Sequence, residues 1–253
     1  MRGELITASK ADERIVSAAL TGSAALDAED HWSDIDLAFG VAGGVEQPRV
    51  IAEWTDRMYR EHGAVHHMDV IAGPAVFRVF LLRSTLQVDL AFWPATEFGP
   101  IASTFRLLFG TANERPKPSA ATALGLLDMG WLYALHARSS IARRRVWQAE
   151  YMISGVRDHV LALACLREGV PTAHGRGMDS LPLETTALLT EALVRSLDID
   201  ELRRAFGIAC AALIDEIERV DIDLAHRLTP TLRELASEGA DTGRATAVGA
   251  HDA

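Results

Sequence analysis

The feature that most constrains the fold of this chain is a change in the spacing of its apolar residues near the middle of the sequence. In the first half, short runs of β-like pattern are interleaved with helical spacing. In the second half, nearly every segment has apolar residues three and four positions apart, as amphipathic helices do. The polar segment 113–119, which contains two prolines, separates the halves. The pattern predicts an α/β domain with a mixed sheet and flanking helices, followed by an all-α helical bundle.

The same patterns predict the domain boundaries. We expect a first domain at residues 1–112, a second at 120–237, and a disordered tail of small and polar residues at 238–253. Strands are expected at 16–20, 34–39, 67–71, 77–82 and 86–92. Helices are expected at 50–61 in the first domain and, in the second, at 124–138, 142–168, 184–196, 199–219 and 223–237.

The charge balance narrows the class of ligand. The net charge of the 253 residues is −10, and basic residues are scattered except for Arg143-Arg144-Arg145. A protein that binds a nucleic-acid backbone usually has a basic face, because neutralised phosphates supply most of its affinity. A long nucleic acid is therefore not expected as a partner, whereas a cationic small molecule suits an acidic field. The three arginines fit either a phosphate contact or a solvated turn between helices.

Neither a membrane span nor a secreted form is expected. No apolar run approaches the roughly 18 residues that cross a bilayer, and the N-terminus lacks the apolar core of a signal peptide. Cys165 and Cys210 lie far apart in apolar helical stretches, without the spacing of metal ligands. These features favour a cytoplasmic protein with reduced, buried thiols.

The segment from Leu20 to Phe39 contains the first residues that indicate chemistry. A predicted strand ends at Gly22-Ser23, and a helix of small residues is expected to follow directly. Such a junction exposes backbone N–H groups, which suit phosphate oxygens. Glycine permits the close approach of a triphosphate, and the Ser23 hydroxyl adds a donor. The simpler interpretation is a turn followed by a helix N-cap.

Three aspartates complete the pattern. Asp34 and Asp36 lie two residues apart on a predicted strand, so both carboxylates project from the same face. Asp89 interrupts an otherwise apolar strand, where a lone carboxylate is costly to bury. Each of these residues also has a simpler explanation. Asp34 and Asp36 could be acids on an exposed face of the strand, and Asp89 could be a structural acid paired with an arginine. Their combination and order favour a site for divalent metal ions that bind the phosphates of a nucleotide.

This order of residues resembles the signature of the DNA polymerase β-like nucleotidyltransferase superfamily. The likeness covers residues 15–95 and rests on Gly22-Ser23, Asp34-Ile35-Asp36 and Asp89. The stretch that begins at Arg145-Val-Trp-Gln-Ala-Glu-Tyr-Met-Ile153 is similar to the helical substrate-binding domain of antibiotic nucleotidyltransferases. Ala24-Ala25-Leu26-Asp27 stands where many relatives have an arginine or glycine, so contacts made by that stretch do not carry over.

The resemblance implies an activity and a set of ligands. Antibiotic nucleotidyltransferases move an AMP group from ATP to a hydroxyl of an aminoglycoside or lincosamide and release pyrophosphate. By this likeness, Gly22 and Ser23 would bind the nucleotide, and Asp34, Asp36 and Asp89 would hold two Mg²⁺ ions. The implied partners are a nucleoside triphosphate and a hydroxylated small-molecule acceptor, and the implied role is antibiotic resistance.

Two residues compete for the role of general base, the group that takes the proton of the acceptor hydroxyl. Glu150 lies on or beside the apolar stripe of its predicted helix, where a carboxylate is out of place. Several members of the family use an acid of the helical domain as the base, which makes Glu150 a candidate. A structural ion pair with Arg143 or Arg157 explains Glu150 equally well, and Asp89 is the rival base.

Asp69, in His66-His67-Met68-Asp69, is the rival for the third metal ligand. Asp89 is preferred because its strand is more apolar and because its position fits the order of the superfamily.

The sequence is also compatible with two other functions. The acceptor could be a protein side chain or an RNA end, or the chain could be a non-catalytic interaction module of the same fold. The three retained acids speak against the second, since a non-catalytic module has no need of them.

Overall fold

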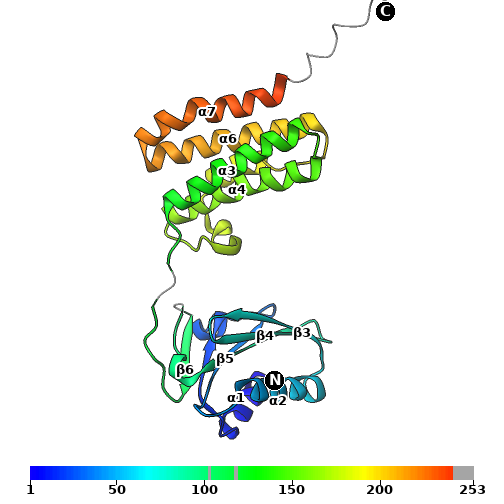
Figure 1. The fold of residues 1–253 in the computed structure, drawn as a ribbon, viewed down its shortest axis with the longest axis vertical. Coiled ribbons are helices and arrows are strands. Elements are labelled where there is room, and N and C mark those ends of the chain that lie inside the picture. Colours follow the sequence, from blue (N-terminus) through cyan, green and yellow to red (C-terminus); the bar gives the residue numbers. More distant parts are fainter. Residues whose placement is uncertain (102–103, 117–118, 242–253) are drawn as a thin grey trace, which may run out of the picture. The chain divides into compact units, whose positions relative to one another are not determined.

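The computed structural model describes residues 1–101, 104–116 and 119–241 (Figure 1). The chain divides into two compact units, Met1–Ser119 and Ala120–Ala253. The first unit combines a mixed sheet with flanking helices, and the second consists of helices. The fold class predicted from the change in apolar spacing is therefore confirmed.

Within the described residues of the first unit, six strands form one sheet in the order β3-β4-β5-β2-β1-β6. The central pair β2–β5 is parallel, and the other neighbouring pairs are antiparallel. A parallel pair needs a long crossover connection, which here contains α2 and the β3–β4 hairpin. The bounds of the strands are Ile15–Thr21 (β1), Ile35–Val41 (β2), Ala64–Ala72 (β3), Ala75–Leu82 (β4), Gln87–Pro94 (β5) and Phe105–Phe109 (β6).

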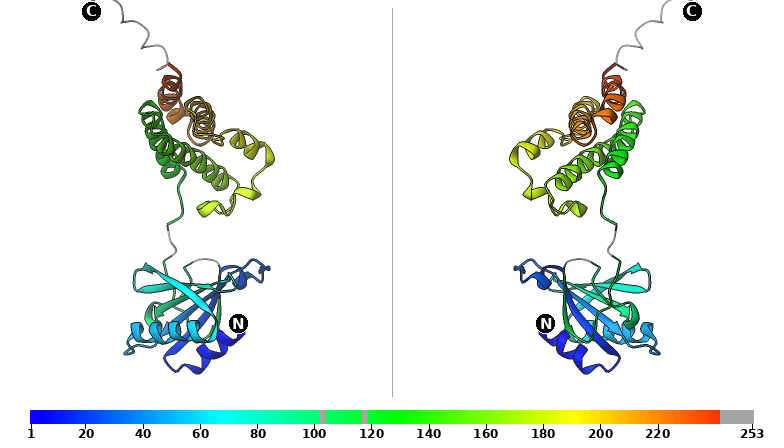
Figure 2. Two further views of the ribbon diagram at one scale, coloured as in Figure 1. Left: turned by 90° about the vertical axis from the view of Figure 1, so that its right-hand side faces the viewer. Right: turned by 90° about the vertical axis from the view of Figure 1, so that its left-hand side faces the viewer.

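Two helices, α1 (Arg2–Ala11) and α2 (Gln47–Glu61), lie on one face of the sheet (Figures 1 and 2). Alternate residues of β2, among them Leu37 and Phe39, are buried in the core that these helices share with the sheet. Each fully buried side chain of this size stabilises the fold by roughly 1.5–3 kcal/mol. A shift of one residue in register would turn the whole set to the opposite face, so this core fixes the register of β2.

The opposite face of the sheet carries a second, smaller cluster. Ala38 and Ala91 are partners in the β2–β5 register and are buried with Trp93 and Phe98. Asp36 and Asp89 are the preceding pair of partners that points to this face. The two acids therefore stand at the end of a small apolar strip, away from the main core under the helices.

Four long helices, α3 (Ala123–Ala142), α4 (Val146–Arg167), α6 (Ile199–Val220) and α7 (Ile222–Asp241), form a bundle in the second unit (Figure 1). A shorter helix, α5 (Leu183–Glu191), packs against α4 and α6. Short 3₁₀ turns interrupt the long irregular stretch between α4 and α5. The common core of the bundle includes Leu127, Ile153, Phe206 and Leu213.

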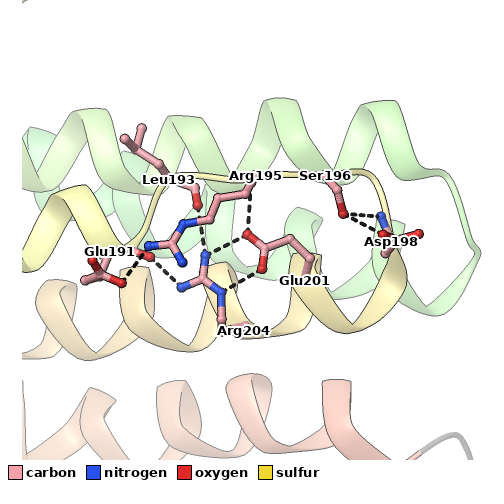
Figure 3. A network of polar contacts seen from close by, with 7 residues as sticks. All are labelled: Glu191, Leu193, Arg195, Ser196, Asp198, Glu201 and Arg204. Carbon is pink, nitrogen blue, oxygen red and sulfur yellow. Dashed lines mark hydrogen bonds and ion pairs between the residues drawn. The ribbon is translucent and has the colours of Figure 1, made fainter.

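A polar network holds the turn between α5 and α6 (Figure 3). Arg204 donates to both carboxylate oxygens of Glu201 and to the carbonyl oxygens of Glu191 and Leu193. Glu201 also accepts a hydrogen bond of 2.9 Å from the backbone N–H of Arg195. These hydrogen bonds, that of Arg204 above all, lower the pKa of Glu201 to about 2. The carboxylate therefore stays ionised, and Arg204 binds the chain where α5 ends.

Several elements depart from their predicted ranges for local reasons. The pattern predicts neither α1, which buries only Leu5 and Ser9, nor the five-residue edge strand β6. α4 begins at Val146 instead of residue 142, because Arg144 adopts a φ of 54° that interrupts the helix. α5 ends at Glu191 and not at residue 196, because Arg204 binds the carbonyls that further helical turns would use.

At the C-terminal end, α7 continues to Asp241, into the segment 238–253 for which disorder is predicted. Residues 242–253 lie outside the described residues. No helix in the described part of the chain combines the length and the apolar character that a membrane span requires.

Candidate metal centre

Asp34, Asp36 and Asp89 come together where two neighbouring strands begin. Because β2 and β5 are parallel, their register places Asp36 beside Asp89. Asp34 immediately precedes β2 and lies two residues before Asp36. One carboxylate oxygen of each aspartate lies within 4.8 Å of the other two. Among the described residues, no other group of three acidic, histidine or cysteine side chains has this spacing.

The triad is half-buried and concentrates negative charge. Burial raises the pKa of Asp89, and the charge of Asp34 raises it further. The side-chain amide of Gln87 opposes this shift, since it donates to both carboxylate oxygens of Asp89 at 3.0 and 3.1 Å. A cation between the three carboxylates would offset their repulsion.

Gly22, at the end of β1, lies against this triad. Its φ is +60°, and a Cβ atom placed on it would overlap Oδ2 of Asp36. Glycine is therefore favoured at this position for two reasons, the left-handed backbone and the close approach. The Gly22-Ser23 turn thus lies directly beside the carboxylate of Asp36.

The chain after Gly22 forms the short 3₁₀-helix η1 (Gly22–Leu26), which corrects the prediction of a helix of small residues that continues from this turn. Asp27 ends η1 because it adopts a φ of 55°. Arg106, on β6, fixes this end: it donates to both carboxylate oxygens of Asp27 at 2.7 and 2.8 Å and to the carbonyl of Ala24 at 2.9 Å. Any phosphate contact here depends on the turn itself and not on the dipole of a long helix.

Asp69 has a different environment. It lies on β3 opposite Arg78 on β4, and Nε and Nη2 of Arg78 each donate to one of its carboxylate oxygens at 2.7 Å. These hydrogen bonds lower the pKa of Asp69. Arg78 also donates to Oγ1 of Thr55 on α2, at 2.6 Å. Asp69 thus belongs to a structural ion pair and not to the triad.

Glu150 lies on α4 in the second unit. It is partly buried and accepts a hydrogen bond of 2.8 Å from Oγ of Ser154. Arg157, one of the two arginines considered as its partner, is instead bonded to Asp158 at 2.7 Å. The run Arg143-Arg144-Arg145 is exposed and forms the turn between α3 and α4, in keeping with the solvated-turn interpretation.

Three residues that contact the triad, or that contact or belong to the segment 22–34 before it, are absent from the sequence prediction. Gln87 lies two positions before Asp89, so alternation along the strand could have placed it on the same face. Arg106 lies on β6, a strand that the sequence pattern does not predict. Trp32 lies two positions before Asp34 and its side chain is 86% exposed. The sequence feature that could have singled out Trp32 is its position as an aromatic residue within an acidic loop.

The donor set fits magnesium. Mg²⁺ binds oxygen ligands at about 2.0–2.1 Å, so ligands on opposite sides of the ion are about 4.2 Å apart. The three carboxylate oxygens lie within 4.8 Å of one another, so small side-chain adjustments would let them bind one ion. Mg²⁺ commonly combines one or two protein carboxylates with the phosphates of a substrate. The triad thus has the chemistry of a site for a metal-bound phosphate ligand.

Comparison with known proteins gives structural likeness but no likeness in sequence. No protein-family model and no curated protein matches the sequence. Among solved structures, the chain is similar to an aminoglycoside 6-adenyltransferase from Bacillus subtilis, with 14% sequence identity and a TM-score of 0.39 over 91% of this chain and 95% of that chain. A likeness at this level does not transfer an activity, so the function has to be inferred from the residues of the site.

The contact between Gly22 and Asp36 gives a first prediction. Gly22→Ala should displace the Asp36 carboxylate and weaken Mg²⁺ binding, measured by calorimetric titration. Gly44→Ala is the matched control, because Gly44 also has a positive φ, of +80°, but a Cβ there meets nothing within 4 Å. Both variants should lose about 1–2 kcal/mol of stability from backbone strain. Wild-type metal affinity in Gly22→Ala would show that the close approach is unimportant.

The different environments of two aspartates give a second prediction. Asp89→Asn should severely weaken metal-dependent ATP binding, because it removes one of three charged ligands. Asp69→Asn should leave that binding nearly unchanged and lower the melting temperature, because it breaks the ion pair with Arg78. Calorimetry with Mg²⁺ and ATP, together with thermal unfolding, measures both. The reverse ranking would assign the third ligand to Asp69.

Proposed function

We propose that this protein is a magnesium-dependent nucleotidyltransferase that transfers AMP from ATP to a hydroxyl of a small molecule and releases pyrophosphate. The observation that carries the proposal is the triad Asp34, Asp36 and Asp89, whose carboxylate oxygens lie within 4.8 Å of one another. The contact of Gly22 with Asp36 supports it further, because it joins a turn that suits phosphate to the metal ligands.

Each residue of the site has a role in this proposal. Asp34, Asp36 and Asp89 would hold two Mg²⁺ ions, and Gly22 and Ser23 would bind the phosphates. The bound ions would neutralise charge on the phosphates during transfer. Gln87 orients the Asp89 carboxylate through its two hydrogen bonds. Catalysis would rest on positioning and charge neutralisation.

The proposed transfer is a single displacement at the α-phosphorus of ATP. The acceptor oxygen forms a bond to the α-phosphorus of ATP while the bond between that phosphorus and the pyrophosphate oxygen breaks. The proton of the acceptor hydroxyl passes to a carboxylate, either Asp89 or Glu150. The products are the adenylylated acceptor and pyrophosphate.

The acceptor is proposed to be a hydroxylated, cationic small molecule of the aminoglycoside or lincosamide type. The net charge of −10 supports a cationic acceptor over a polynucleotide. The resemblance of the segment around Arg145–Ile153 to antibiotic nucleotidyltransferases points to the same class.

The test of this function is a mass-shift screen. The purified chain, incubated with ATP, Mg²⁺ and a panel of hydroxylated antibiotics, should add an AMP group to at least one of them. Asp36→Asn should reduce this turnover by about a hundred-fold or more, because it removes metal-dependent stabilisation of several kcal/mol. Its melting temperature without metal should be equal to or above that of the wild type, since like-charge repulsion is relieved.

Other outcomes of the same screen decide between the alternatives. Transfer to protein or RNA, with none to small molecules, would change the acceptor class. Wild-type turnover by Asp36→Asn would remove the metal ligands from the mechanism. A wild-type chain that neither transfers AMP nor binds ATP with Mg²⁺ would be a non-catalytic module.

The choice of general base gives a further prediction. If Glu150 takes the proton, Glu150→Gln should lower turnover by about a hundred- to ten-thousand-fold, with unchanged ATP affinity and melting temperature. Ser154→Ala is the matched control, since it removes the hydrogen bond to Glu150 but no carboxylate. A less stable Glu150→Gln protein with normal turnover would make Glu150 structural and assign the base to Asp89.

A further inference from the structure

The loop of residues 27–34 connects the Gly22-Ser23 turn to the first metal-binding aspartate. At its tip stands Trp32, the most exposed of the large apolar side chains in the described part of the chain, at 86%. The His31 ring packs edge-to-face against its indole, with ring centroids 5.1 Å apart. An indole that is left in water forgoes the stabilisation that burial provides. The position of this side chain therefore calls for an explanation.

Polar contacts hold the first part of the loop to other elements and fix the turn that carries Trp32. Asp27 is bonded to Arg106 on β6, and Glu29 forms an ion pair with Arg2 on α1. At the tip, Oδ1 of Asp30 accepts hydrogen bonds from the backbone N–H of Trp32 at 2.8 Å and from the hydroxyl of Ser33 at 3.1 Å. The exposed indole thus stands on a backbone that is fixed by contacts to two other elements.

The place of Trp32 relative to the metal centre follows from covalent geometry. No cis peptide bond occurs in the described segments of the chain, so two trans peptide units separate the Cα atoms of Trp32 and Asp34. These atoms are therefore no more than about 7.6 Å apart. The single segment from Gly22 to Asp36 carries the phosphate turn, the indole and two metal ligands. A ligand bound to the turn and the triad would therefore lie close to the part of the segment that carries the indole.

We propose that Trp32 stacks on the base of the nucleotide whose phosphates bind at the Gly22-Ser23 turn and the aspartate triad. The inference rests on the proposed function and deepens it, because it assigns the recognition of the base to a residue outside the metal centre. Every nucleobase has a π-face, so stacking on an indole provides affinity with little discrimination between bases. Trp32 is thus a residue for affinity and orientation of the donor nucleotide.

The proposal is tested by comparing two ligands that share phosphates and differ in the base. ATP and inorganic tripolyphosphate are titrated into the full chain by calorimetry in the presence of Mg²⁺. Trp32→Ala should weaken ATP binding by about ten-fold, a typical value for the loss of one base–aromatic stack. It should leave tripolyphosphate binding unchanged, and Trp32→Phe should retain most of the ATP affinity. Leu183→Ala, which removes another exposed large apolar side chain, one that is 79% exposed, is the matched control and should change neither affinity.

Fluorescence gives a second readout. ATP with Mg²⁺ should quench part of the tryptophan emission of the wild type, tripolyphosphate should not, and Trp32→Phe should abolish the quenching.

The outcomes separate this proposal from the function on which it rests. Equal ATP affinity of the wild type and Trp32→Ala would overturn the stacking role, as would an equal loss of affinity for both ligands, which would reveal a collapsed loop. Binding of tripolyphosphate as tight as that of ATP to the wild type would overturn it too. If the wild type bound neither ligand with Mg²⁺, the proposed function would fail and the stacking role with it.

Discussion

The parallel pairing of β2 with β5 is the constraint on which the rest of the first unit depends. In a parallel pair, residues that are direct partners in the register point to the same face, so Asp36 and Asp89 stand together, and Asp34 follows from its spacing to Asp36. The crossover that this pairing requires carries α2, and α2 covers the opposite face. The arrangement that builds the main core also places three carboxylates close together at the other face. A cation between them would relieve their repulsion.

Two aspartates of the same sheet show that environment, and not residue type, decides the role. Asp69 faces Arg78, which donates to both of its oxygens, and hydrogen bonding lowers its pKa. Asp89 faces Gln87 and Asp34, and burial raises its pKa. The first carboxylate is stabilised by its neighbour on β4 and links two strands. The second is left with a neutral donor and a like charge, which is the condition that suits a metal ligand.

How far the sequence predicts this structure depends on whether a feature is local. Helical and strand periodicity are local, so the fold class and most elements are predictable, and the spacing of Asp34 and Asp36 is sufficient to place both on one face. The register that brings Asp89 beside Asp36 is not local, and neither is the bond between Arg106 and Asp27, which joins a strand at the edge of the sheet to the end of η1. Element ends were missed where a single side chain decides them, as Arg204 does at the end of α5.

The close approach of Gly22 to Asp36 has a consequence for how such a site is inherited. A side chain at position 22 would overlap the Asp36 carboxylate, so any residue other than glycine there requires the carboxylate to move, whether or not a phosphate binds. A lineage that keeps this aspartate in its present position therefore still favours glycine at position 22. A lineage that exchanges Asp36 for a smaller residue is released from that overlap at position 22. Substitutions at positions 22 and 36 should therefore be coupled. Glycine after β1 is expected wherever an aspartate occupies the position of Asp36.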